Sequence, residues 1–279
     1  MRTIEDSTAE YARGLAGGFL LSLPLLYTME VWWQGFILSP THLLAFVGVT
    51  FVLLLGYNRF SGMRRDASFI EVVIDSVEEL GLGIILSTLI LFCLNKIWLG
   101  MPIEEALGKI TIEAMTVAIG VSVGTAQLMS DDEDTGMEGD SDDNNSFDRR
   151  AFFEQIFVSF CGATLVGSSI APTEEVLEIA VSSSTLHLIS LMILSLCVIA
   201  AVLYMSNFKG ADEIEGKKRL TNKLETVSVV YAISIGSAFV LLWMYGQMSG
   251  VSPAVVISEA VVLAFVTSLG ASAGRLLIQ

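Results

Sequence analysis

The chain has 279 residues, of which 53% are hydrophobic and only 16% are charged, and its net charge is −15. Soluble globular domains carry about a quarter charged residues, so this composition argues against a soluble domain and indicates a chain that lies in lipid. The acidic balance gives no reason to expect a nucleic-acid partner, because nucleic-acid phosphates attract basic surfaces.

Long apolar runs follow one another along the whole chain, without the strand-like alternation of a membrane barrel. A helix crosses the roughly 30 Å of bilayer hydrocarbon with about 20 apolar residues, and its backbone groups bond to one another. The sequence therefore predicts an all-α polytopic membrane protein with eight transmembrane helices in the lipid bilayer. The expected spans are residues 14–35, 42–58, 77–99, 105–129, 152–180, 185–206, 226–248 and 253–276.

Basic residues are distributed unevenly between the two sides of this arrangement. Thirteen lysines and arginines fall on the side of the termini, and only Lys96 and Lys109 fall on the opposite side. Since cytoplasmic loops carry the excess of basic residues, we expect a multi-pass protein of the cell membrane with both termini in the cytoplasm. The outer helix ends carry tryptophans that would form an aromatic belt, namely Trp32, Trp33, Trp98 and Trp243.

A strongly acidic segment, residues 130–148, divides the chain nearly in half. It has almost no apolar residues and its like charges repel one another, so we expect a disordered, solvated linker. The predicted domain organisation is a first four-helix membrane repeat at 1–129, an acidic cytoplasmic linker at 130–150 and a second four-helix membrane repeat at 151–279.

A calcium-binding loop is the alternative interpretation of this segment. Asp140, Asp142 and Asn144 match the first three ligand positions of such a loop. However, the sixth position, which requires glycine for a sharp turn, is Asn145, and the twelfth, which requires a bidentate Glu, is Ala151. The pattern therefore favours the solvated linker.

The two halves of the chain resemble each other. Glu113 matches Glu259 at an offset of 146 residues, within stretches that share further alanine, serine and glycine positions. At an offset of 148 residues the matching pairs are Pro24 with Pro172 and Glu30 with Glu178. We infer two tandem repeats, and because each has an even number of spans, the repeats are expected in parallel orientation.

Carboxylates inside the spans are the candidate functional groups, because an ionisable side chain in hydrocarbon costs several kcal/mol. Four of them are expected in the outer third of the membrane, where a twofold axis would gather them around one site: Glu30, Glu113, Glu178 and Glu259. Without basic partners they must bind a cation or share protons, and their oxygens suit Ca²⁺, Mg²⁺ or Mn²⁺. The identity of a metal is left open. The alternative is that these side chains reach lipid headgroups.

Two prolines and a further acidic pair lie beside these positions. Pro24 and Pro172 are expected to kink their helices and free a carbonyl one turn back, a device found beside ion sites. Glu174 and Glu175 follow Pro172 and join the predicted cation-binding residues. The segment Gly167–Glu174 resembles the Gly-Ser-x-Pro-Glu core of the calcium/cation antiporter superfamily. An extra threonine separates Pro from Glu, the first half lacks the match, and that superfamily has inverted repeats.

The remaining acidic residues and the histidines admit two interpretations each, and the small residues admit one. Four acidic residues share one helical face and would form an inner vestibule or a solvated helix extension: Glu71, Asp75, Glu78 and Glu79. His42 and His187 each precede an outer helix start, where a histidine senses pH or only packs. Glycines at G-x-x-x-G spacing are expected to let helices approach closely, namely Gly120, Gly124, Gly270 and Gly274.

The run Pro24–Glu30 with Trp32, together with Pro172–Glu175, resembles an integral-membrane family of unknown function found in bacteria and archaea. The resemblance spans most of the length. It implies the membrane class and brings no assigned activity.

The function that these features predict is cation transport, by a channel or a carrier, through a pathway at the interface of the two repeats. An inorganic cation or a proton is the expected partner, and no cofactor is expected. An enzyme is not expected, because the sequence lacks the H-E-x-x-H, G-x-S-x-G and phosphate-loop patterns. The alternative is a non-transporting assembly or sensory subunit of the membrane, and a homo-oligomer is left open.

Overall fold

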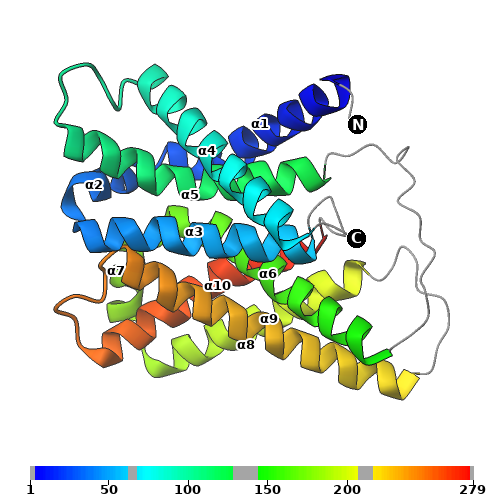
Figure 1. The fold of residues 1–279 in the computed structure, drawn as a ribbon. Coiled ribbons are helices and arrows are strands. Elements are labelled where there is room, and N and C mark those ends of the chain that lie inside the picture. The colour runs from blue at the N-terminus through cyan, green and yellow to red at the C-terminus, as the bar shows by residue number, and fades with distance from the viewer. Residues whose placement is uncertain (1–3, 62–67, 128–143, 207–215, 277–279) are drawn as a thin grey trace.

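The structure is a computed structural model that describes residues 4–61, 68–127, 144–206 and 216–276. Within these ranges every regular element is a helix (Figure 1). The helices are α1 Ile4–Leu26, α2 Met29–Ile37, α3 Pro40–Phe60, α4 Phe69–Cys93, α5 Ile103–Gln127, α6 Asn144–Ile170, α7 Glu174–Ser182, α8 Thr185–Ser206, α9 Gly216–Met244 and α10 Pro253–Leu276. Seven are long and apolar enough to span a membrane, and the bent pair α1–α2 makes an eighth candidate. The predicted all-α polytopic membrane class is confirmed.

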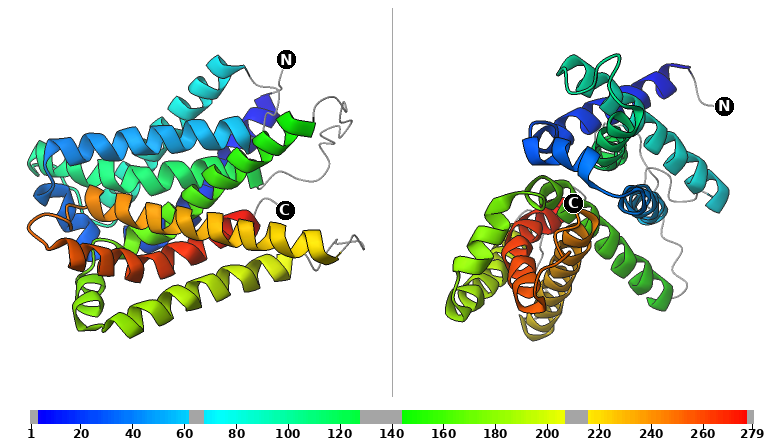
Figure 2. Two further views of the ribbon diagram at one scale, coloured as in Figure 1. Left: turned by 90° about the horizontal axis from the view of Figure 1, so that it is seen from below. Right: turned by 90° about the vertical axis from the view of Figure 1, so that its left-hand side faces the viewer.

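The described helices run back and forth between two ends of one bundle. The first and last described residues lie at the same end, here called the terminal end (Figure 1). The opposite end, here called the short-helix end, carries α2, α7 and the connections 94–102 and 245–252 (Figures 1 and 2). An even number of crossings accounts for this placement of the two chain ends.

The expected first and fifth spans are not continuous helices, which corrects the prediction. Residues 14–35 are divided between α1 and α2, whose axes differ by 84° across the break. Residues 152–180 are divided between α6 and α7. Pro172 lies in the second break, as expected for a residue without a backbone N–H. Pro24, in contrast, lies inside α1. The chain turns only at Thr28, whose hydroxyl donates a hydrogen bond to the Pro24 carbonyl oxygen at 2.6 Å.

Other helix boundaries were shifted by local capping. The span expected at 77–99 is α4, which begins at Phe69 because Ser68 and Glu71 form a reciprocal capping box, and ends at Cys93. The spans expected at 185–206 and 253–276 coincide with α8 and α10. α6 begins at Asn144, inside the range assigned to the linker. The rest of that acidic segment, including Asp140 and Asp142 of the calcium-loop alternative, lies outside the described residues.

Each half of the chain packs around one central helix, α5 in the first half and α10 in the second. The end-on view in Figure 2 places α1–α5 on one side and α6–α10 on the other. Along their most apolar stretches, 78% of the residues of α5 are buried, against only 11% for α8. The order of long and short helices is the same in both halves, although the duplication itself stays a prediction.

The capping residues around the short helices are in register at an offset of 145 residues. Thr28 and Thr173 precede α2 and α7. Ser39 Oγ lies 2.8 Å from His42 Nδ1, and Ser184 Oγ lies 3.0 Å from His187 Nδ1. Both histidines therefore take part in the first turn of the helix that follows, which favours the packing interpretation. Their response to pH stays a prediction.

The G-x-x-x-G glycines mediate close helix contacts, as expected. Gly17 of α1 lies against Gly120 and Gly124 of α5, and Gly162 of α6 lies against Gly270 and Gly274 of α10. Small residues let two backbones approach in this way, and van der Waals contact then stabilises the pair inside a membrane.

Replacing Gly17 with alanine should destabilise the fold, because the added Cβ would lie 2.6 Å from the Gly120 carbonyl oxygen. Overpacking of this kind costs about 1–3 kcal/mol. Gly81 is the matched control, because a Cβ there meets nothing within 4 Å and alanine improves helix propensity by about 1 kcal/mol. Thermal unfolding in detergent, followed by circular dichroism, should give a lower midpoint for Gly17→Ala than for Gly81→Ala. Equal midpoints would contradict the packing.

The two halves meet through aromatic contacts at both ends of the bundle. At the terminal end Phe60 of α3 stacks on Phe157 of α6 with ring centroids 5.5 Å apart, and Gly56 leaves room for the Phe157 ring. At the short-helix end Phe46 of α3 meets Tyr245 edge-on at 5.1 Å. The largest hydrophobic cluster of the described residues therefore includes both halves, beside a smaller cluster within each half.

Candidate functional site

A large cavity opens at the short-helix end, between the two halves. Its volume is about 870 Å³. It is lined by α2 from the first half and by α7, α10 and the turn after α9 from the second half. We call it the acidic cavity, because Glu30, Glu174, Glu178 and Glu259 all line it.

The acidic cavity brings together four of the six predicted cation-binding residues. Glu30 comes from α2, Glu174 and Glu178 from α7, and Glu259 from α10. The remaining two, Glu113 and Glu175, do not line it. The expected ring of Glu30, Glu113, Glu178 and Glu259 is therefore replaced by a set in which the second half supplies three carboxylates and the first half supplies one.

Two side chains of the acidic cavity hold buried oxygen atoms without a hydrogen-bond partner among the described residues. They are Glu259 Oε2 and Gln34 Oε1. Glu259 is only 2% exposed and Gln34 only 9%. Buried acceptors are almost always hydrogen-bonded in folded proteins, so an orphaned pair beside a cavity requires a ligand or water to satisfy it. Both atoms are acceptors and suit a cation.

Two glutamines of the acidic cavity were missed by the sequence reasoning, which searched the spans for charged groups. Gln34 follows Trp33 on α2, and the Gln247 side-chain N–H donates to the Pro172 carbonyl oxygen at 3.3 Å. That bond joins the turn after α9 to the break between α6 and α7. Gln34 could have been found from the sequence, because it is a polar amide within an otherwise apolar run.

The carboxylates of the acidic cavity are not close enough to enclose a bare metal ion. In the part of the chain that the structure describes, no group of three or more Asp, Glu, His or Cys side chains has the geometry of a metal site. Mg²⁺ and Ca²⁺ bind proteins through several oxygens at once and keep waters where protein ligands are few. This arrangement suits a cation that retains part of its water.

Glu113 lies on the other side of α2 from the acidic cavity. It is 0% exposed, and neither of its carboxylate oxygens has a hydrogen-bond partner among the described residues. The indole of Trp32 and the phenol of Tyr245 lie near it. Neither the indole nitrogen nor the phenol oxygen makes a hydrogen bond of good geometry within the described chain. Glu113 is thus a sealed carboxylate rather than a member of the cavity.

The helix boundaries change the expected pairing of carboxylates. At the offset of 145 residues set by Thr28 and Thr173, Glu30 corresponds to Glu175 and not to Glu178. Burial agrees with this register, since Val31 and its counterpart Val176 are 0% and 3% exposed. The offset of 148, based on Pro24 and Pro172, does not describe the fold here because the two prolines occupy different places relative to the breaks.

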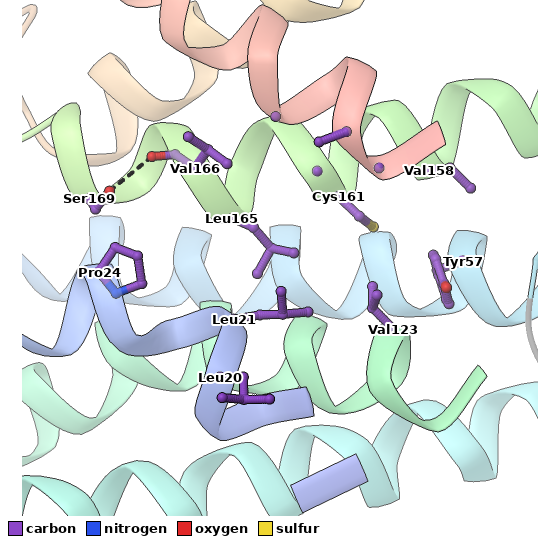
Figure 3. A pocket seen from close by; sticks show the side chains of 14 residues that line it. Leu20, Leu21, Pro24, Tyr57, Val123, Val158, Cys161, Leu165, Val166 and Ser169 are labelled. Atoms are coloured by element: carbon purple, nitrogen blue, oxygen red, sulfur yellow. Dashed lines mark hydrogen bonds between the residues drawn. The ribbon is translucent and has the colours of Figure 1, made fainter. Parts of the chain in front are cut away.

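A second cavity lies deeper between the halves and is almost entirely apolar (Figure 3). Its volume is about 240 Å³. Leu20, Leu21 and Pro24 of α1 face Leu165 and Ser169 of α6 across it. We call it the apolar cavity. α6 connects the two cavities, because its residues 158–169 line the apolar one and residues 171–172 beyond its end line the acidic one.

Towards the terminal end, the first half contains a buried polar network. The Asn58 side-chain N–H groups donate to Glu79 Oε2 at 2.6 Å and to Ser76 Oγ at 3.1 Å. The Ser122 hydroxyl donates to Asn58 Oδ1 at 3.0 Å. All four side chains are at most 9% exposed. Cys161, which lines the apolar cavity, lies within electrostatic range of Glu79.

This network divides the acidic stripe that the sequence placed on one helical face. Glu79 is buried beside Asn58, whereas Glu71 is exposed and caps α4, and Glu78 is exposed. Asp75 is half-buried between them. Three of the four carboxylates thus lie at or near the surface of the described protein, as the helix-extension interpretation expects, and only Glu79 points into the core.

The model of one protein family matches residues 10–278, almost the whole chain. The family is described as "Putative integral membrane protein (DUF2391)". No curated protein and no solved structure matches the chain.

Proposed function

Because the chain belongs to this DUF2391 family of integral membrane proteins, we propose that it moves a cation across the membrane through a pathway between its two halves. The observation that carries the proposal is the acidic cavity, where carboxylates from both halves converge and two buried acceptor oxygens have no hydrogen-bond partner among the described residues. Rings of acidic side chains attract and select cations at the mouths of membrane pathways.

The proposed pathway has three parts along the interface of the halves. The acidic cavity collects the cation at the short-helix end. The apolar cavity follows along α6 and acts as the barrier, because an apolar constriction excludes water and ions until it widens. The Asn58–Glu79 network offers the next buried oxygens towards the terminal end. A closed barrier between two polar regions suits a carrier or a gated channel.

We place the protein in the cell membrane with the terminal end in the cytoplasm. Arg59 ends α3 at the terminal end, whereas the two lysines of the short-helix end are Lys96 and Lys109. Lys109 is paired with Glu105 at 2.6 Å. Trp33, Trp98 and Trp243 are about half exposed at the short-helix end, as an aromatic belt at the membrane surface requires.

The test is cation flux into proteoliposomes, with reporters for Ca²⁺, Mn²⁺, K⁺ and H⁺. Glu259→Gln should reduce the flux of the transported ion at least about tenfold, because it removes the most buried carboxylate of the cavity. Glu175→Gln is the matched control, because Glu175 lies on the same end, is exposed and does not line the cavity. Absence of flux for every ion, from folded wild-type protein, would overturn the proposal.

The alternative function is a non-transporting assembly or sensory subunit, possible as a homo-oligomer. The observation that favours it is α8, whose apolar stretch is only 11% buried and presents an unpartnered surface. Without flux, but with a defined oligomer in detergent, the protein would belong to this second class. Cation flux that depends on Glu259 would show that assembly or sensing is not the sole function of the protein.

A further inference from the structure

Glu113 and Glu259 occupy matching positions in the two central helices, 146 residues apart, but their surroundings differ. Glu259 lines the acidic cavity, whereas Glu113 is fully enclosed. The element that separates them is α2. Glu30 and Gln34 of α2 line the cavity, while Trp32 and Gly35 of the same helix face α5. α2 is therefore a partition one helix thick.

The partition is closed by a backbone contact that only glycine allows. A Cβ at Gly108 of α5 would collide with the Gly35 carbonyl, and a Cβ at Gly35 would lie 2.7 Å from the Lys109 nitrogen. In the second half the matching residues are Ala180 and Ala254, whose methyl groups leave no room for a backbone contact of this kind. The sequence thus builds a sealed carboxylate in one half and an open one in the other.

Trp32 adds the second element of the seal. Its ring lies beneath the Lys96 ammonium, 3.8 Å from the ring centroid, and its indole nitrogen lies near the Glu113 carboxylate. The matching residue of α7 is Leu177, which lines the acidic cavity instead. A cation–π contact holds Trp32 in place between Lys96 and Glu113.

The charged and titratable groups around Glu113 are few. Tyr245 and Lys96 approach from the turn after α9 and the connection before α5, and His42 of α3 contacts Trp243 at this end. Lys109, one turn before Glu113 on α5, is paired with Glu105. Groups on the other packed helices lie nearer the terminal end: Arg13 of α1 and Glu79 of α4 are level with residues 122–124 of α5, and Cys161 of α6 is near Glu79.

We propose that Glu113 is a proton-binding site, distinct from the cation site of the acidic cavity and separated from it by α2. Glu113 makes no hydrogen bond of good geometry and no ion pair among the described residues, and in a dry interior such a carboxylate is more stable as the neutral acid. When α2 lifts from α5, hydronium in the water of the acidic cavity gives its proton to the carboxylate, which leaves a carboxylic acid and a water molecule. This deepens the proposed function and rests on it, since proton release from Glu113 would balance the entry of a cation at Glu259.

Infrared spectroscopy of the protein in lipid nanodiscs tests the site without any transport assay. At neutral pH the wild type should show the carbonyl band of a protonated carboxylic acid. Glu113→Gln should remove that band, and Glu175→Gln, an exposed control, should leave it unchanged. In D₂O the band should shift slowly in the wild type, because the partition limits exchange of the acid proton.

The partition is tested by replacing a residue of the first half with the residue type that the second half has at the matching position. Gly108→Ala or Trp32→Leu should speed the D₂O shift at least about tenfold, the equivalent of opening made easier by about 1.4 kcal/mol. If Gly108→Ala fails to fold, Trp32→Leu still decides. A carbonyl band of unchanged intensity in Glu113→Gln overturns the protonated site at Glu113. A band that shifts equally fast in all three proteins overturns the partition. Both results can be read even if the protein transports nothing.

Discussion

Replacing Glu174 and Glu178 together with lysine should reduce cation entry about ten- to hundredfold at low ionic strength. Both side chains are exposed on α7 and line the acidic cavity, so the substitutions reverse the charge of its mouth. Charges of one sign around a concave opening raise the local concentration of counter-ions and speed their association by similar factors. The measurement is initial flux into proteoliposomes as a function of salt.

The salt dependence separates a field effect from a structural one. Screening lengths fall from about 10 Å at 0.1 M salt to about 3 Å at 1 M, so the deficit should shrink as salt is raised. Glu104→Lys with Glu175→Lys is the matched control, because both residues are exposed at the same end and neither lines the cavity. An equal loss in this control would mean that only the net surface charge matters.

Replacing Asn58 with leucine should destabilise the protein by about 2–4 kcal/mol. The change removes both donors to Glu79 and Ser76 and the acceptor of Ser122, all of them buried. Removing one partner of a buried polar pair costs more than the bond is worth, because the remaining groups lose their solvation without compensation. Unfolding in detergent, followed by circular dichroism, measures the loss.

A second substitution distinguishes the network from simple packing. Asn58→Leu with Glu79→Leu should recover most of the lost stability, since the Glu79 carboxylate is then no longer buried without the Asn58 amide. Ser87→Ala is the control on the same helix as Glu79, because its buried hydroxyl has no partner among the described residues and its removal should be nearly neutral. A double variant no more stable than Asn58→Leu would contradict the coupling of the two side chains.

Much of the fold could be predicted because the bilayer imposes length and apolarity on each span. α8 and α10 matched their expected ranges, and the two ends of the described chain lie at the same end of the bundle (Figure 1). The breaks after α1 and α6 could not be predicted from hydropathy, because α2 and α7 are as apolar as the spans they follow. Thr28 and Thr173 each precede a short helix and marked both breaks, and Pro172 marked the second.

The sequence predicted part of the membership of the candidate site, and its cation-binding chemistry stays a prediction. Acidic residues within apolar runs identified Glu30, Glu174, Glu178 and Glu259, which share the cavity. Glu113 was expected to join them because it matches Glu259 in sequence. Glu113 does not line the cavity, because the contact between Gly35 and Gly108 holds α2 against α5. This is a contact between two helices, and it cannot be predicted from the sequence pattern of either helix alone.

α5 and α8 differ in how much of their surface is buried, and this difference determines how freely their sequences can change. On α5, where 78% of the apolar stretch is buried, side-chain volume is constrained at nearly every position. On α8, where the figure is 11%, any residue that remains apolar should serve equally well, unless a partner covers that helix. Sequence change should therefore accumulate faster on α8 than on α5 and α10, so the predicted duplication is best tested by comparing the two central helices.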